Sequence, residues 1–139
     1  MTDELLFDSF FAIARASPRD QFHEAAKFWS DKIQSEKIPI VVTQAVILEI
    51  GNALSKIQFR SIVVGLLESF EKSENITVVS MTDGLYDEAF ELFRSRHDKE
   101  WGLVDCVSFV VMRERKITAA LTADEHFIQA GFRALLREN

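Results

Sequence analysis

Short apolar runs alternate with longer amphipathic stretches along this chain. Runs rich in β-branched and aromatic residues predict strands over residues 5–7, 40–43, 75–81, 117–122 and 132–136. Apolar residues spaced three or four positions apart predict helices over residues 20–37, 45–57, 62–70, 85–96, 103–112 and 125–130. This alternation is typical of an α/β domain with a mostly parallel central sheet, here of about five strands.

An aspartate follows two of the predicted strands. Asp8 comes directly after strand 5–7, and Asp124 comes shortly after strand 117–122. Ligands of parallel sheets bind beyond the carboxyl ends of the strands, so both residues lie where a site is expected. The simpler alternative, that both are ordinary turn residues, stays open.

Two further acids interrupt apolar helix faces. Glu49 falls at the edge of a predicted stripe that consists of Val46, Ile50, Ala53, Leu54 and Ile57. Its alternative role is that of a rim residue whose carboxylate reaches water. Asp105 falls in the first turn of helix 103–112, where the positive end of the helix dipole favours an anion. Gly102 already suits the cap position, so Asp105 is expected to lie too deep for a capping role alone.

The occurrence of an acid in each of four apolar segments favours one shared explanation over four independent ones. A buried carboxylate without a partner is strongly destabilising, so the set predicts a bound cation. Carboxylates bind hard cations such as Mg²⁺ and Mn²⁺, which suit phosphate chemistry. A water bound to such a metal becomes a nucleophile near neutral pH, and a second metal can stabilise the departing oxygen. Hydrolysis of a phosphodiester is therefore the natural chemistry of these acids.

Composition limits the class of protein. With 139 residues, 47% of them hydrophobic, the chain is expected to form one domain over residues 1–139. The single cysteine, Cys106, cannot form an internal disulfide and is expected to be a buried apolar residue in a reducing compartment. The apolar stretch 5–13 is interrupted by Asp8 and is too short for a signal peptide or a membrane span. We therefore expect a soluble, cytoplasmic protein.

Net charge alone argues against a phosphate-binding surface, because 22 acidic and 16 basic residues leave a formal charge of −6. Two divalent cations would bring this to −2. Basic residues also cluster locally, at Arg94, Arg96 and Lys99, at Arg113, Arg115 and Lys116, and at Arg133 and Arg137. Most such clusters are solvated helix faces, and a nucleic-acid role would need only some of them.

Other chemistries fit the sequence poorly. A phosphatase with an aspartyl nucleophile would have a second aspartate two residues after Asp8, where this chain has Phe10. Ser9 lacks the glycine-rich turn of a serine hydrolase nucleophile. The histidines have no mutual metal-ligand spacing and stand at His23, His97 and His126. The last of them is expected to pack near Phe127 or to face solvent.

Each of the four acids stands within a short motif. The motifs are Phe7-Asp8-Ser9, Glu49-Ile50-Gly51-Asn52, Trp101-Gly102-Leu103-Val104-Asp105-Cys106-Val107-Ser108-Phe109, and Leu121-Thr122-Ala123-Asp124-Glu125-His126-Phe127 with Ala130-Gly131-Phe132 after it. They resemble the motifs of PIN domains, and most closely those of the VapC-type toxins of bacterial and archaeal toxin-antitoxin pairs. The resemblance covers essentially the whole chain in the expected order, and the last two motifs are specific.

This resemblance implies a PIN-like three-layer α/β/α fold and a divalent-metal-dependent endoribonuclease that hydrolyses RNA phosphodiester bonds. The catalytic and metal-binding residues would be Asp8, Glu49, Asp105 and Asp124. The cofactor would be Mg²⁺ or Mn²⁺. Polar positions that lie beside the acids in the family are matched by Ser9, Asn52 and Thr122, which would support the ligands.

The chain departs from the family at three positions. Phe10 stands where a small polar residue is common, and Gly102 where a hydroxyl residue is usual. Val104 stands where threonine usually precedes the third acid. These changes remove hydrogen-bonding groups near the ligands and could weaken metal affinity or alter the choice of RNA. Because the acids are intact, we still expect activity.

The resemblance also implies a homodimer. The chain contains 12 phenylalanines, more than a small core needs. We expect an apolar surface patch with contributions from Phe10, Phe11, Phe59 and Phe90.

A second implied partner is a small antitoxin protein that inhibits the toxin. We expect it to place an arginine among the four acids, where a bidentate ion pair would displace metal. Its amphipathic helix is expected to occupy a groove on the exposed sides of helices 20–37 and 45–57, around Phe28, Trp29 and Ile47.

Two alternatives to a toxin ribonuclease stay open. One is a PIN-fold module that binds RNA or protein without significant nuclease activity. The other is a structure-specific DNA nuclease, because the same metal chemistry cleaves either polymer. Metal-dependent cleavage separates the first alternative from the enzyme, whereas the sequence does not separate RNA from DNA.

Overall fold

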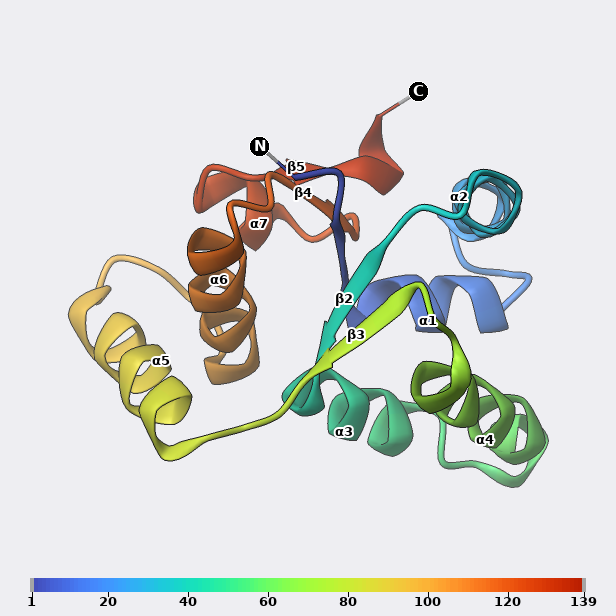
Figure 1. Cartoon of the computed structure of the whole chain (residues 1–139), viewed down its shortest axis with the longest axis horizontal. Helices are drawn as coiled ribbons and strands as arrows, with labels where there is room; N and C mark the ends of the chain where they lie inside the picture. Colours follow the sequence, from blue (N-terminus) through green and yellow to red (C-terminus); the bar gives the residue numbers. More distant parts are fainter. Residues whose placement is uncertain (1, 139) are drawn as a thin grey trace.

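Within residues 2–138, which the computed structural model describes, five parallel strands form one central sheet (Figure 1). The strands are β1 (Leu5–Phe7), β2 (Ile40–Thr43), β3 (Ile76–Val79), β4 (Ala119–Leu121) and β5 (Arg133–Ala134). Their order is β3-β2-β1-β4-β5, and Leu6 of the central strand pairs with Val41 on one side and Ala120 on the other. The predicted parallel sheet is thus confirmed.

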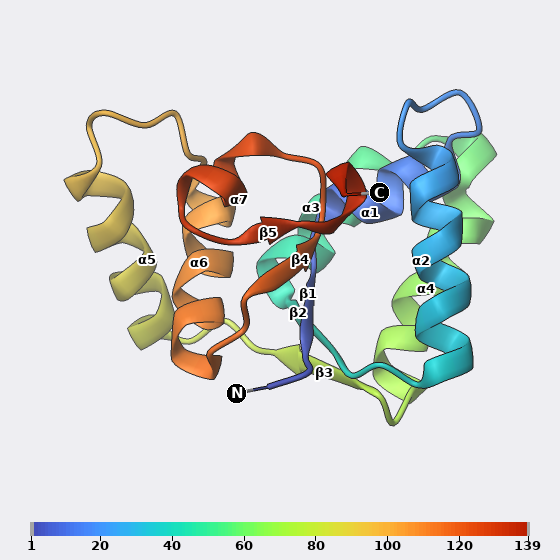
Figure 2. The same cartoon turned by 90° about the horizontal axis from the view of Figure 1, so that it is seen from above.

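Helices cover both faces of this sheet. They are α1 (Ser9–Ala16), α2 (His23–Glu36), α3 (Gln44–Ala53), α4 (Ile57–Lys72), α5 (Asp83–Ser95), α6 (Leu103–Arg115) and α7 (Glu125–Gln129). Figure 2 shows α5 and α6 on one side of the sheet and α2 and α4 on the other, which confirms the three-layer α/β/α architecture. Each helix in the described part of the chain is too short or too polar to cross a membrane.

The two faces of the sheet bury separate apolar cores, because successive residues of a strand point to opposite faces. The core beneath α1, α2 and α4 contains Phe7, Val42 and Leu121 from the strands. The core beneath α5 and α6 contains Leu6, Val41 and Ala120. Since both faces are covered, the strands read as continuous apolar runs in the sequence. Cys106 is fully buried in the second core, as expected.

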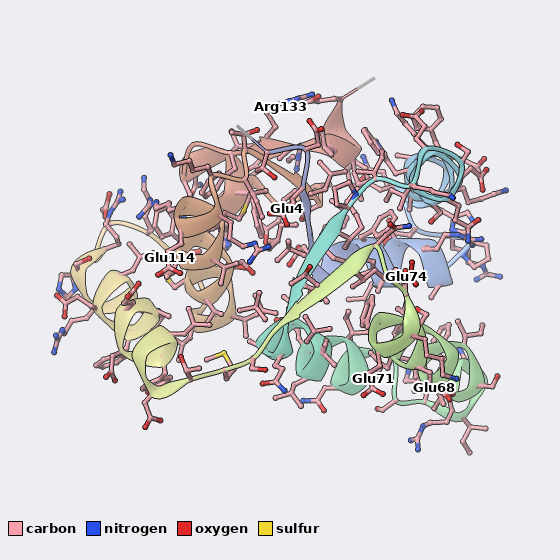
Figure 3. The ribbon with its side chains drawn as sticks, in the orientation of Figure 1. Glu4, Glu68, Glu71, Glu74, Glu114 and Arg133 are labelled. Atoms are coloured by element: carbon pink, nitrogen blue, oxygen red, sulfur yellow. The ribbon has the colours of Figure 1, made fainter. Side chains whose placement is uncertain are left out.

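The direction of α6 brings its first turn to the edge of the sheet where β1 ends. Arg115, in the last turn of α6, donates hydrogen bonds of 3.1 and 2.7 Å to the carboxylate of Glu4. Glu4 lies just before β1 (Figure 3). The hydrogen bonds from Arg115 also lower the pKa of Glu4. Because the end of α6 lies beside the start of β1, the start of α6 lies toward Asp8, which follows β1.

Within the described residues, α1 is the one α-helix that the sequence pattern did not predict. Residues 5–13 are almost continuously apolar, so the helical period is masked where β1 passes into α1. Asp8 separates the two elements, since its extended backbone (φ −102°, ψ 155°) occupies the cap position of α1. Phe11, Ala12 and Ala14 are then buried.

The predicted helix 45–57 and strand 132–136 are both too long. α3 ends at Ala53, which is exposed, and Ile57 begins α4 with 94% of its surface exposed. The buried stripe of α3 therefore consists of Val46 and Ile50, continued by Leu54 after the helix. Strand β5 has two residues, because a 3₁₀ turn begins at Leu135.

Candidate functional site

Four acids from four different elements converge at the carboxyl edge of the sheet. Asp8 follows β1, Asp124 precedes α7 shortly after β4, Asp105 lies in the first turn of α6, and Glu49 lies in α3. Burial raises the pKa of Asp8, and the charges of Asp105, Glu49 and Asp124 raise it further. The four carboxylates are therefore close enough to interact, as one shared site requires.

Asp8 is the most deeply buried of the four acids, with 5% of its surface exposed. Thr122 Oγ1 donates a 2.8 Å hydrogen bond to Asp8 Oδ2, which stabilises the charged form. Burial and the neighbouring acids outweigh this bond, and the pKa of Asp8 rises to about 7. A buried carboxylate surrounded by like charges lacks a counter-ion, and a bound cation would supply one.

Thr122 also connects Asp8 to Asp124. Its hydroxyl oxygen accepts a 3.1 Å hydrogen bond from the backbone N–H of Asp124 while donating to Asp8. Asp124 Oδ1 in turn accepts from the backbone N–H of His126 at 2.9 Å and thereby caps α7. The position of Asp124 is thus held by the turn between β4 and α7.

Asp105 has a capping role in addition to its place beside the other acids. Its Oδ2 accepts a 3.2 Å hydrogen bond from the backbone N–H of Gly102, the residue at the cap position of α6. As the third residue of the helix, Asp105 reaches back to the cap and forms one half of a capping box, because glycine has no side chain to accept the return hydrogen bond. Burial raises the pKa of Asp105, and the charge of Asp124 adds to this, against the lowering by His126 and Gly102. Capping and membership of the acidic site are therefore compatible.

His126 belongs to the site, and the sequence-based expectation that it packs near Phe127 or faces solvent was wrong. Its Nδ1 lies 2.9 Å from Asp105 Oδ2 and 3.5 Å from Asp124 Oδ1. Burial disfavours its charged form, yet the hydrogen bond to Asp105 and the charges of Asp124, Asp105 and Glu100 raise the pKa of His126. The pKa of Asp105 is raised despite the hydrogen bond to His126, because burial is the largest effect there. The surrounding carboxylates favour the charged form of His126.

The signal that could have identified His126 is the start of α7. Asp124 caps α7 by accepting from the backbone N–H of His126, so His126 stands two residues from an acid of the site in the sequence itself. A histidine can bind metal together with carboxylates, so the lack of mutual spacing among the histidines does not exclude His126.

The three expected supporting residues have different surroundings. Thr122 is fully buried and contacts two of the acids, as described above. Ser9 is half-buried as the first residue of α1, directly after Asp8. Asn52 is exposed near the end of α3, one turn after the half-buried Glu49.

The departures from the family pattern have structural explanations. Phe10 packs edge to face against Phe22, with ring centroids 5.5 Å apart, so it joins α1 to the segment before α2. Val104 packs against the core beneath α1, α2 and α4. Gly102 contacts Asp105 through its backbone N–H, which needs no hydroxyl side chain. None of these three changes removes one of the acids.

The donor atoms suit a hard divalent cation. Ligand atoms of Asp105, Asp124 and His126 all lie within 4.8 Å of one another. Asp8 and Glu49 add two further carboxylates to the same neighbourhood. Several carboxylate oxygens with one imidazole nitrogen form a donor set that accepts Mg²⁺ or Mn²⁺. The residues therefore fit the metal that the sequence analysis expected.

Two solved structures resemble this chain over nearly its whole length. VapC20 of Mycobacterium tuberculosis, a sarcin-ricin-loop-cleaving toxin, is 26% identical with a TM-score of 0.79, and the match covers 92% of this chain and 95% of VapC20. FitAcB from Neisseria gonorrhoeae is 17% identical with a TM-score of 0.60, and the match covers 94% of each chain. The second likeness shows the fold alone. A search of curated proteins found no match.

A comparison with protein-family models agrees with the fold. Residues 6–133 match the model of the PIN domain. This range contains the four acids and reaches from β1 into β5. The chain therefore belongs to the PIN domain family.

Proposed function

We propose that this protein is a divalent-metal-dependent endoribonuclease and the toxin of a toxin-antitoxin pair, acting as one domain. The observation that carries the proposal is the convergence of Asp8, Glu49, Asp105 and Asp124 from four elements onto one edge of the sheet. Membership of the PIN domain family and the likeness to the toxin VapC20 support it. A cytoplasmic location stays a prediction.

In the proposed reaction, the four acids would hold Mg²⁺ or Mn²⁺, and Asp8 would be the most buried ligand. A bound divalent cation would lower the pKa of a water molecule and stabilise the negative charge that develops on the phosphodiester. Thr122 fixes the carboxylate of Asp8, and His126 fixes that of Asp105, so both acids are oriented before substrate binds. Water adds across one P–O bond, which leaves a phosphate on one product and a hydroxyl on the other.

RNA is the substrate that the comparisons favour over DNA. VapC20, which is described as cleaving the sarcin-ricin loop, has a TM-score of 0.79 with this chain. The identity of 26% is too low to transfer that particular loop to this protein. We therefore propose RNA as the substrate class, without a named site of cleavage.

An inhibitory antitoxin partner is part of the proposal. Phe28 is 60% exposed and packs edge to face with Trp29. A groove of about 990 Å³ lies between α2 and α4, with α1 at its base, and its lining includes neither Phe28 nor Trp29 nor Ile47. It exposes apolar side chains such as Ile33, Ile62 and Leu66. An amphipathic helix of the partner fits this apolar groove best.

The homodimer also remains a proposal, but the surface that we propose for the contact differs from the expected phenylalanine patch. Phe11 is buried, and Phe10 and Phe59 are partly buried against the core, so Phe90 is the exposed member of the expected patch. Outside the groove assigned to the antitoxin, large apolar residues with higher exposure lie on α3 and α4, at Leu48, Ile57 and Val64. These residues are the better candidates for the contact between two copies.

Incubation of the purified protein with total RNA tests the function. Reactions with Mg²⁺, with Mn²⁺ and with EDTA should be followed by mapping of the RNA ends. We expect defined new ends with either metal and intact RNA with EDTA. Binding of RNA without cleavage under all conditions would favour the non-enzymatic PIN module, and cleavage of DNA alone would favour a DNA nuclease.

A further inference from the structure

A pocket lined by aromatic and basic residues lies between α5 and the segment that connects α5 to α6. Its volume is about 410 Å³. The aromatic residues of its lining are Phe90, Phe93 and Trp101, and the basic residues are Arg94, Arg96, His97 and Lys99. Acidic side chains are absent from the described lining, although the chain as a whole carries a charge of −6. This combination suits a nucleotide, which has a flat base and an anionic phosphate.

Trp101 connects the pocket to the acidic site. Its Nε1 donates a 3.0 Å hydrogen bond to Gln129 Oε1 in α7, the helix that begins beside Asp124. The next residue in the chain is Gly102, whose N–H binds the carboxylate of Asp105. Trp101, one wall of the pocket, therefore contacts the helix that follows Asp124 and directly precedes the residue that binds Asp105. The pocket lies beside the acidic site.

Phe93 offers the pocket a ring on which a base can stack. The ring of Phe90 is already engaged, because it lies parallel to Tyr86 with centroids 6.1 Å apart and beneath the guanidinium of Arg94 at 5.4 Å. Phe93 is 44% exposed. A base that stacks on an exposed phenylalanine buries apolar surface of both partners.

The basic side chains can take a phosphate. Arg96 lies over the ring of Trp101 at 4.8 Å and forms an ion pair with Asp98 at 3.0 Å, which fixes its position. Lys99 Nζ lies 3.6 Å from the same Asp98, and Arg94 pairs with Glu91. These pairs are on the surface, where ion pairs are weak, so a phosphate can compete for the cations.

We propose that this pocket binds one nucleotide of a single-stranded RNA next to the phosphodiester held at the acids. The base stacks on Phe93, and Lys99 and Arg94 hold its phosphate. A single strand is required because the bases of a duplex are stacked on one another and cannot enter. The inference rests on the proposed ribonuclease function, since it describes how that substrate is held.

Binding of a short single-stranded oligoribonucleotide of mixed sequence tests the pocket apart from catalysis. Fluorescence anisotropy in EDTA reports its Kd without cleavage. Phe93→Leu should raise the Kd roughly 5- to 100-fold, the range for loss of one stacked base. Lys99→Gln should reduce the slope of log Kd against log salt concentration by roughly 0.7. A duplex of the same sequence should compete poorly.

Two matched controls lie away from the pocket. Phe28→Leu removes an exposed ring from α2, and Arg113→Gln removes an exposed charge from the far end of α6. Both should bind the oligonucleotide as the wild type does. Circular dichroism and melting temperature should show that all four variants are folded, and a variant that fails this check is replaced by Phe93→Met or Lys99→Met.

The outcomes separate the pocket from the ribonuclease. If both pocket variants bind the oligonucleotide with wild-type affinity, or if the wild type does not bind it, the proposed role of the pocket is wrong even if RNA is cleaved normally. Loss of binding in the pocket variants without any metal-dependent cleavage supports the pocket and contradicts the nuclease. Equal weakening by the controls and the pocket variants would show non-specific attraction and would also overturn the inference.

Discussion

Thr122 donates a 2.8 Å hydrogen bond to Asp8 across 114 positions of the sequence, and both side chains are buried. The bond joins the ends of β1 and β4, which are neighbours in the sheet. Because the same hydroxyl accepts from the N–H of Asp124, Thr122 fixes two acids of the site at once. Convergence of the acids thus depends on strand pairing and on this one side chain.

Replacement of Thr122 tests this role. Thr122→Val keeps the shape of the side chain but removes the hydroxyl, which leaves the buried Asp8 carboxylate without its donor. We expect a loss of about 1 to 3 kcal/mol of folding free energy and a further rise in the pKa of Asp8. The acid limb of the pH–cleavage profile should move to higher pH. Thr122→Ser should restore both properties, and equal behaviour of the valine and serine variants would contradict the role.

The stability of the metal-free protein should fall as pH rises from about 4 to about 7. The pKa of Asp8 is 3.8 in the unfolded reference and about 7 in the fold, so the folded state holds a proton in this range that the unfolded state has released. Below both pKa values Asp8 does not change the free energy of unfolding. Above both pKa values it lowers the free energy of unfolding by about 4 kcal/mol.

Urea unfolding in EDTA at several pH values measures this dependence. Asp8→Asn should flatten the curve between these pH limits, because the amide does not titrate. Millimolar Mn²⁺ should raise the melting temperature of the wild type most above pH 7, where the carboxylate is charged. If the free energy of unfolding of the wild type and of Asp8→Asn depends on pH in the same way, the raised pKa of the buried Asp8 is contradicted.

His126 should strengthen metal binding, either as a ligand or by orienting Asp105. We expect His126→Gln to weaken Mn²⁺ affinity by roughly 10- to 100-fold, the usual effect of losing a group that contacts a ligand. Electron paramagnetic resonance of free Mn²⁺ measures this affinity without catalysis. His97→Gln removes an exposed histidine outside the acidic cluster and should bind Mn²⁺ like the wild type. If His126→Gln binds Mn²⁺ with wild-type affinity, His126 does not contribute to metal binding.

A homodimer should form through the apolar surface of α3 and α4. Light scattering at micromolar concentration is expected to give twice the chain mass of 15.9 kDa. Leu48 is 68% exposed, so Leu48→Asp should dissociate the dimer without unfolding either copy. A species of 15.9 kDa for the wild type would reject the dimer.

The apolar pattern of the sequence was sufficient to predict the parallel sheet and to single out acids that interrupt apolar segments. Strands buried on both faces are continuously apolar, so an aspartate directly after such a strand, as at Asp8, is conspicuous. Asp105 was conspicuous for the same reason, since α6 is buried over most of its length. The parallel topology then predicted that acids after strands would meet at one edge.

Other features depend on tertiary contacts that no local pattern carries. α1 was missed because its apolar residues continue those of β1, and the end of α3 was misplaced because Ile57 is apolar but exposed. The role of His126 depends on Asp105, which is 21 residues away in the sequence and meets it only in the fold. The groove between α2 and α4 likewise depends on how separate helices pack.

The most direct test of the central claim is the rate of RNA cleavage by Asp8→Asn in saturating Mn²⁺. The change removes one negative charge from the most buried acid at nearly constant volume, so the protein should fold and cleavage should fall by at least about 100-fold. Asp87→Asn, at an exposed position of α5, is the matched control and should cleave at the wild-type rate. Cleavage by Asp8→Asn at the wild-type rate would contradict the account of a metal-dependent ribonuclease site at these four acids.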